Sequence, residues 1–300
     1  MTFNHLERGK FSVSKWLYQL FLNFFIYPSI WVAAGIASLG MFTQRVLELG
    51  DNWQPIAFIF VTALIPYNLD RIFDSYIQEI PEAQAQLFFR KPYIFVLLFS
   101  AIAATAALLY YAPLRVRYVS FAGIIPLVYG TPLFPWKTKS GLHWYRLKDI
   151  PGSKAWIVGS TLTYAVIALP LAYAGAKFNL VAAFTTLFMF VFIVSNAHVF
   201  DIRDIESDRE KGVVTLPIMV GIKGTKTLLT TINLLMLLII ISAWITDTMT
   251  FHPEIILATA VTISYIWAVK AETPRSVYSI WIEGCLFVPL LANWAIATIF

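Results

Sequence analysis

The sequence predicts an all-α membrane protein, a polytopic bundle of nine transmembrane helices around a central cavity. Of its 300 residues, 59% are hydrophobic and only 13% are charged, whereas about a quarter of the residues of a typical soluble domain are charged. Apolar runs of about 20 residues, the length that crosses a bilayer, recur along the chain. The short connections between these runs leave no room for a soluble domain, so residues 1–300 are predicted to form one membrane domain.

Nine apolar runs are long enough to be membrane spans. They are residues 17–41, 54–73, 92–112, 115–132, 155–175, 179–200, 226–247, 253–270 and 277–299. The fourth run is the weakest, because Pro126 and Gly130 interrupt it. The polar N-terminal residues and the length of the first run are not typical of a cleavable signal peptide. The single cysteine, Cys285, excludes an intramolecular disulfide.

The basic residues are distributed unevenly between the two ends of such a bundle. Alternating the connections of nine spans places all but four of the 22 Lys and Arg residues at one end. The four at the other end are Arg45, Arg115, Arg117 and Lys177. Cytoplasmic loops of membrane proteins carry an excess of Lys and Arg, so the N-terminus and the basic end are expected to face the cytoplasm. The net charge of +5 then reflects topology, and it does not point to nucleic acid. We expect a plasma, inner or thylakoid-type membrane.

Acidic residues gather in two places, both at the basic end. Asp201, Asp204 and Asp208 follow the sixth run, and on a helix their spacings would place them on one face. Asp70 and Asp74 follow the second run and are four residues apart. Carboxylates on one face repel one another unless a cation lies among them, and such hard oxygen ligands suit Mg²⁺ or Ca²⁺. Two acidic faces that approach each other across a bundle would hold a metal-bound diphosphate between them.

The acidic group after the sixth run resembles the signature of the UbiA-type intramembrane prenyltransferase superfamily. That signature, three aspartates followed by a glycine, a threonine and a proline, is matched by Asp201, Asp204, Asp208, Gly212, Thr215 and Pro217. Tyr129, Pro132 and Lys137 are similar to the loop that follows the superfamily's fourth span. The earlier acidic group matches in part: aligned on Asp74, the superfamily's asparagine and first aspartate fall at Pro66 and Tyr67, and Asn68 is displaced by two residues.

The resemblance implies an enzyme that transfers a polyprenyl group from an isoprenyl diphosphate to an aromatic or other lipophilic acceptor, with Mg²⁺ as cofactor. The implied metal ligands are Asp70, Asp74, Asp201, Asp204 and Asp208, of which all but Asp201 are also the expected catalytic residues. The candidate diphosphate contacts are Arg71, Lys137, Lys139, Arg203, Asn68 and Asn196. Mg²⁺ between carboxylates and phosphate oxygens would stabilise the charge that builds on the leaving group.

Other interpretations stay open at this stage. A membrane terpene cyclase of the same superfamily would use the same ionisation, with the substrate's own double bond as acceptor. A cation-coupled transporter would need ionisable groups at mid-membrane depth, whereas these acids cluster at one end. A catalytically silent relative would act as a binding partner. Outside the two acidic groups, Asn196 is as readily structural as functional, whereas a lone membrane histidine such as His198 is more often structural than a base. Glu283 in the ninth run is expected to face the bundle or to snorkel.

Overall fold

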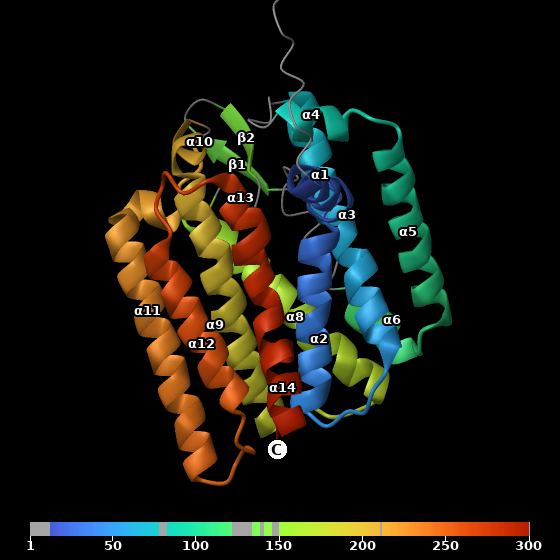
Figure 1. Ribbon diagram of the computed structural model, residues 1–300, viewed down its shortest axis with the longest axis vertical. Coiled ribbons are helices and arrows are strands. Elements are labelled where there is room, and N and C mark those ends of the chain that lie inside the picture. Colours follow the sequence, from blue (N-terminus) through green and yellow to red (C-terminus); the bar gives the residue numbers. More distant parts are fainter. Residues whose placement is uncertain are drawn as a thin grey trace, which may run out of the picture.

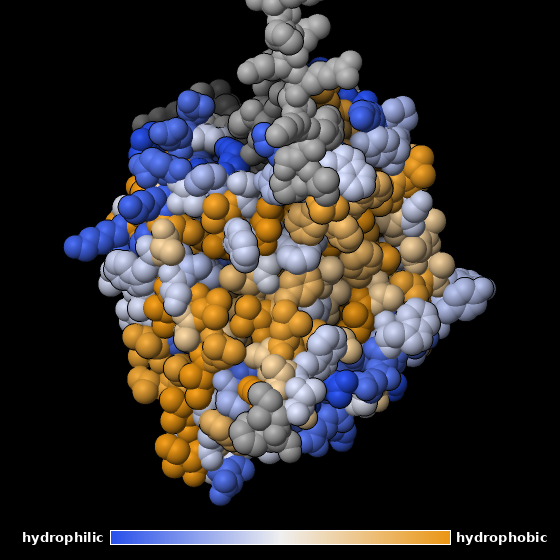
Figure 2. All heavy atoms as spheres, in the orientation of Figure 1, coloured by the Kyte–Doolittle hydropathy of each residue, from blue (hydrophilic) through white to orange (hydrophobic). Residues whose placement is uncertain are grey.

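The computed structural model describes residues 13–77, 83–121, 134–138, 141–145, 150–210 and 212–299. These residues form a bundle of roughly parallel helices, with short elements gathered at one end (Figure 1). The helices are α1 (Val13–Phe21), α2 (Ile30–Val46), α3 (Trp53–Ile77), α4 (Ala83–Phe89), α5 (Tyr93–Tyr111), α6 (Leu114–Ser120), α8 (Ser153–Ala174), α9 (Leu180–Arg203), α10 (Ile205–Glu210), α11 (Leu216–Ile245), α12 (Pro253–Ala268), α13 (Arg275–Val277) and α14 (Val288–Ile299). Figure 2 shows a broad hydrophobic belt between hydrophilic ends, as expected for a bundle that crosses a membrane.

Six helical segments of the described chain are long and apolar enough to cross a bilayer. They are Trp53–Ile72, Tyr93–Tyr111, Ser153–Ala174, Leu180–Arg203, Leu216–Ile245 and Arg275–Thr298. A bent pair at the N-terminus raises the number to seven, and α12, with 16 residues, is shorter than a full span. The predicted fourth span continues past α6 into residues 122–132, outside the described residues. Six or seven of the nine predicted spans are therefore supported, and nine stays a prediction.

The first predicted span, residues 17–41, is not one straight helix. It consists of α1, the π-helical turn η1 (Leu22–Ile26) and α2, with a bend of 60° before α2. Pro28 lacks the N–H that a continuous helix needs, and Ser29 adopts a positive φ of 59°. The bend lets α1 lie across the end of the bundle while α2 runs through it (Figure 1).

The helical bundle also carries one short β-hairpin, which the sequence did not predict and which leaves the all-α fold class unchanged. Strand β1 (Phe134–Thr138) pairs antiparallel with β2 (Gly141–Tyr145), and Trp136 lies opposite His143. Aromatic residues and threonine suit a short pleated strand, and hydropathy over a 20-residue window cannot detect such a short element. The hairpin lies at the end of the bundle that carries α4 and α10 (Figure 1).

Helix α9 lies at the centre of the core and packs against α8, α11, α12 and α2. Phe188, Met189 and Val194 are fully buried on it. Helix α8 comes close to it at Gly159, where an added Cβ would overlap the Val194 side chain and lie 3.2 Å from the Val194 Cα. Glycine therefore permits the close contact that holds α8, and the residues at its start, beside α9.

Substituting valine for Gly159 is expected to destabilise the bundle by about 1–3 kcal/mol, because overpacking forces two helix backbones apart. Thermal unfolding in one detergent measures the change as a lower Tm. The matched control is Ala174→Val, at the exposed end of the same helix, which should leave the Tm nearly unchanged. An unchanged Tm in Gly159→Val would show that the two helices can move apart here without loss of stability.

The connections alternate between the two ends of the bundle as the distribution of basic residues predicts. The α2–α3, α5–α6, α8–α9 and α11–α12 connections lie at one end, and α4, the hairpin, α10 and the start of α13 lie at the other (Figure 1). The last turns of α3 and α9, which carry the two acidic groups, both reach the second end. The two groups therefore lie on the same side of the hydrophobic belt, as the shared site requires.

Candidate active site

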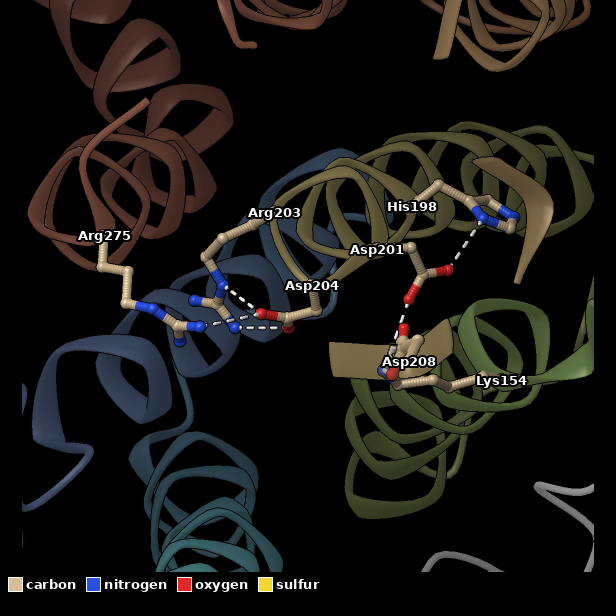
Figure 3. A network of polar contacts seen from close by, with 7 residues as sticks. All are labelled: Lys154, His198, Asp201, Arg203, Asp204, Asp208 and Arg275. Atoms are coloured by element: carbon tan, nitrogen blue, oxygen red, sulfur yellow. Dashed lines mark hydrogen bonds and ion pairs between the residues drawn. The ribbon is translucent and has the colours of Figure 1, made fainter. Parts of the chain in front are cut away.

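The chain bends within the second acidic group. Helix α9 ends at Arg203, Asp204 is its C-cap with φ −95° and ψ 9°, and the short α10 begins at the next residue. The N–H of Asp208 still donates to the Asp204 carbonyl at 2.8 Å. This break corrects the expectation of a single helical face, because the three carboxylates point into two separate groups of polar contacts (Figure 3).

Lys154, in the first turn of α8, lies between two of the aspartates. Its Nζ is 3.5 Å from Asp201 Oδ1 and 3.3 Å from Asp208 Oδ2. Both carboxylates are buried, with side chains 4% and 7% exposed. On the far side of Asp201, His198 Nδ1 is 3.4 Å from Oδ2, and Trp156 packs edge-on against the imidazole. Two carboxylates thus converge on one cation in a largely dry position.

Asp204 faces arginines instead. Arg203 donates to both Asp204 oxygens, at 2.8 Å from Nε and 2.7 Å from Nη2, and Arg275 Nη2 lies 3.8 Å from Oδ1. The Arg203 guanidinium also lies over the rings of Phe200 and Tyr278, 4.8 and 5.6 Å from their centroids. Bidentate pairing and ring stacking fix both the place and the orientation of this guanidinium.

The two environments shift the acidities of the aspartates in opposite directions. Burial alone would raise the pKa of Asp204, but the hydrogen bonds from Arg203 and the charges of Arg203, Lys154 and Arg275 outweigh it and hold that pKa below its usual value. For Asp208, burial dominates, and with the neighbouring charges of Asp201 and Asp204 it raises the pKa despite the opposing charge of Lys154. A buried carboxylate whose charge is disfavoured is typical of a functional site.

Asp204→Asn is expected to lower the free energy of unfolding at pH 7 by about 1–3 kcal/mol, the usual value of hydrogen bonds to a charged group. The depressed pKa means that this stabilisation is complete above the unfolded-state pKa of about 4 and is lost as the pH falls through the folded-state pKa. Thermal unfolding from pH 7 to pH 3 should show the variant's deficit shrinking below about pH 4. Glu210→Gln, at an exposed acid nearby, serves as control. A deficit in stability that is constant over this pH range would contradict the lowered pKa of Asp204.

The first acidic group lies on the last turns of α3. Asp70 is exposed, and the neighbouring Arg71 donates to the Ile26 carbonyl at 3.2 Å and lies 4.0 Å from Glu283 Oε1. Glu283 is buried and lies within electrostatic range of both Arg71 and Arg203. Glu283 therefore pairs with the arginine of the first acidic group and also feels the charge of an arginine of the second. The Asp74 side chain lies outside the described residues.

The remaining predicted contacts divide into structural and undescribed residues. Asn68 Nδ2 donates to the carbonyls of Pro28 and Leu64, which leaves only its buried Oδ1 acceptor without a hydrogen bond among the described residues. Asn196 Nδ2 donates to the Ile282 carbonyl at 3.0 Å. Both amides thus connect separate segments of the bundle. Because both N–H groups of Asn68 are used, a diphosphate oxygen could reach this side chain only through a proton or metal at Oδ1. The Lys137 side chain, Lys139, Tyr129 and Pro132 lie outside the described residues.

Lys154 and Arg275 were expected only among the basic residues at the cytoplasmic end of the bundle. Each lies in the first turn of a helix, where the helix dipole disfavours a positive charge, at the same end as the aspartates. A cation in that unfavourable position needs an anionic partner, and this signal could have identified both residues before the structure was known.

Comparison with known proteins identifies the chain. The family model described as VviA prenyltransferase matches residues 49–299. The chain belongs to this family. Several solved structures have the same fold as this chain. A UbiA homologue from Archaeoglobus fulgidus bound to GPP and Mg²⁺ superposes with a TM-score of 0.61 at 11% identity, over 93% of this chain and 99% of that one.

Two further structures have the same fold as this chain. A digeranylgeranylglyceryl phosphate synthase has a TM-score of 0.55 at 16% identity, over 94% of this chain and 99% of that one. The apo UbiA homologue from Aeropyrum pernix K1 has a TM-score of 0.58 at 15% identity, over 91% and 98% of the two chains. No protein of curated function matches the sequence. The chain thus belongs to the VviA prenyltransferase family and shares its fold with these solved structures.

Proposed function

We propose that this protein transfers an isoprenyl group from its diphosphate to an aromatic or other lipophilic acceptor within the membrane, with Mg²⁺ as cofactor. The observation that carries the proposal is the convergence of buried Asp201 and Asp208 on one cation, at the same end of the bundle as Asp70. Membership of a prenyltransferase family supports it, as does the fold shared with a homologue bound to GPP and Mg²⁺.

The residues present fit a Mg²⁺ ion. Asp201 and Asp208 already hold the Lys154 ammonium between them, and Mg²⁺ takes one or two carboxylates and completes its shell with water and phosphate oxygens. The described residues contain no cluster of three or more metal-binding side chains, which agrees with an ion that is partly coordinated by its substrate. Asp70, Asp74 and Asp204 are the further proposed ligands. The bound ion would neutralise negative charge on the leaving diphosphate.

The chain's own residues have distinct tasks in this reaction. The C1–O bond of the allylic diphosphate breaks and its electron pair leaves with pyrophosphate. The acceptor carbon then supplies the electron pair of the new bond and releases a proton. Arg203, Arg71 and Lys154 are proposed to donate hydrogen bonds to phosphate oxygens as their charge rises. Lys137 and Lys139 are proposed for the same role. The apolar interior of the bundle keeps water from the carbocation.

We also propose that the site opens toward the cytoplasm. All but four of the 22 basic residues belong to segments at the end that carries the aspartates, if the chain has nine spans. Isoprenyl diphosphates have a polar, charged head and an apolar tail. A cationic site at the edge of the hydrophobic belt can therefore contact the diphosphate while the tail lies in the apolar interior.

A single assay tests the proposed function. The purified full chain is incubated with geranyl, farnesyl, geranylgeranyl and longer diphosphates, with and without a panel of aromatic and lipid acceptors, in Mg²⁺ or EDTA. Pyrophosphate release that needs both an acceptor and Mg²⁺, with a prenylated product, is the expected result. Release without an acceptor and with a cyclic product would instead identify a terpene cyclase. If no diphosphate is consumed under any condition, the proposal is wrong.

A further inference from the structure

A groove of about 480 Å³ lies at the other end of the bundle from the aspartates. Its walls come from α6, the second half of α8 and the start of α9, and they include Thr163, Tyr164, Leu171 and Phe178. Tyr164 and Phe178 are exposed, so the groove opens sideways on the surface of the hydrophobic belt. It has no part in the chemistry proposed above.

The groove has the length of one leaflet of a bilayer. Thr163 and Gly175, which mark its two ends along α8, are 12 residues apart and therefore about 18 Å apart at the rise of an α-helix. Half of the hydrocarbon core of a bilayer is about 15 Å thick. Because Gly175 lies just after the end of α8 and Thr163 lies near the helix middle, the groove runs from the interface to the membrane centre.

Positive charge gathers at the interface end of the groove. Arg115 lines it, and Lys177 lies between the lining residues Ala176 and Phe178. With Arg117, these are three of the four basic residues predicted for this end of the protein. None of the three forms an ion pair with an acid in the described part of the chain, whereas the fourth, Arg45, is paired with Asp51. The mouth of the groove therefore lacks an anion.

The Arg115 guanidinium is held in place before any ligand arrives. Its Nη2 donates to the Tyr173 carbonyl at 2.9 Å, and it lies against Gly175, where an added Cβ would overlap it. Gly175 has a positive φ of 67°. A glycine is therefore needed here both for the turn after α8 and for the close approach of the Arg115 guanidinium. Fixed in this way, the guanidinium keeps other N–H groups for an anion at the mouth.

A second polar group lies deep in the groove. Thr163 is 3% exposed, and its hydroxyl has no hydrogen-bond partner among the described residues. A buried hydroxyl without a partner is costly, and an oxygen-bearing ligand would relieve that cost. The groove thus combines an anion site at the interface, an apolar wall one leaflet long and an unused hydroxyl.

From this arrangement we infer that the groove binds one anionic phospholipid, with the phosphate at Arg115 and Lys177 and an acyl chain along α8. The site lies in the leaflet opposite the proposed active site. It is independent of prenyl transfer and would exist even if the chain had no enzymatic activity.

The test is native mass spectrometry of the full chain in detergent, titrated with phosphatidylglycerol or with phosphatidylcholine that has the same acyl chains. The wild type should bind one phosphatidylglycerol at least about fivefold more tightly than phosphatidylcholine, the value expected for one basic residue near a lipid phosphate. Arg115→Gln should remove this preference. Arg45→Gln, which changes the same charge at the same end away from the groove, should keep it.

A filling variant separates the groove from general surface charge. Ala168→Trp places an indole on the wall and leaves Arg115 intact, so it should lower the binding of both lipids. If Arg115→Gln does not fold, Ala168→Trp still tests whether the lipid binds in the groove. Equal affinity of the wild type for the two lipids overturns the inference, as does a preference that survives in Ala168→Trp. Displacement of phosphatidylglycerol by farnesyl diphosphate would also overturn it, because the groove would then be a substrate site.

Discussion

Replacing Asp208 by asparagine is expected to reduce kcat/KM for prenyl transfer by at least about 100-fold. The Asp208 carboxylate is buried, Lys154 is its one cationic contact among the described residues, and its pKa is raised above the usual value. A charge that the fold disfavours is expected to contribute little to stability, and we propose that this carboxylate serves to bind a cation. Pyrophosphate release at saturating Mg²⁺ measures the loss, and thermal unfolding should show a Tm close to that of the wild type.

The control for this variant is Glu206→Gln, which removes an exposed acid on the same short helix α10. It should leave turnover and Tm unchanged. Equal losses in the two variants would mean that general negative charge at this end matters rather than the Asp208 carboxylate. Normal turnover in Asp208→Asn would remove this residue from the proposed site.

Removal of divalent metal is expected to lower turnover more than about 1,000-fold, since a Lewis acid contributes several kcal/mol to stabilising the charge on a leaving group. Lys154 cannot replace the ion, because its single positive charge is already offset by two carboxylates and would neutralise only a small part of the charge on a pyrophosphate. The measurement is pyrophosphate release after chelation with EDTA, followed by titration of Mg²⁺ back into the sample.

Activity should return with excess Mg²⁺ and should not return with an equal ionic strength of Na⁺ or K⁺. Asp208→Asn should need a higher Mg²⁺ concentration for half-maximal release than Glu206→Gln. Turnover that persists after exhaustive chelation would show that the cationic side chains alone carry the reaction.

The arrangement of the bundle could be predicted from the sequence because hydrophobic length and loop charge act over whole spans. The bend in the first span could not, although Pro28 is its cause, since a proline at this position also occurs in straight or mildly kinked membrane helices. The hairpin was missed because Phe134–Thr138 and Gly141–Tyr145 are too short to affect a hydropathy average.

The acidic residues could also be found from the sequence, but the division of their contacts could not. Their spacing fits one face of a continuous helix, whereas Asp204 caps α9 and its carboxylate turns to Arg203 and Arg275. Lys154 is 54 residues from Asp208 in sequence, so only the packing of α8 on α9 brings them together. Spacing along a chain carries no information about such a long-range contact.

The environment of Glu283 could also be predicted only in part from the sequence. The sequence predicted that it faces the bundle or snorkels, and the structure places it inside, near Arg71. It lies between the π-helical turn η4 (Tyr278–Ile282) and the 3₁₀ turn η5 (Cys285–Phe287). The Trp31 and Asn196 side chains donate to the carbonyls of Ile280 and Ile282 in this irregular stretch. Hydropathy cannot reveal this local irregularity, which depends on partners from α2 and α9.

The central claim is that the two acidic groups bind one diphosphate together through divalent ions. The most direct measurement counts bound Mn²⁺ by electron paramagnetic resonance in the presence of farnesyl thiolodiphosphate, which ionises too slowly to turn over. We predict about two ions per wild-type chain and a loss of about one of them in Asp70→Asn/Asp74→Asn and likewise in Asp201→Asn/Asp208→Asn. Full binding in both double variants, or no Mn²⁺ bound to the wild type with the analogue present, would contradict the claim.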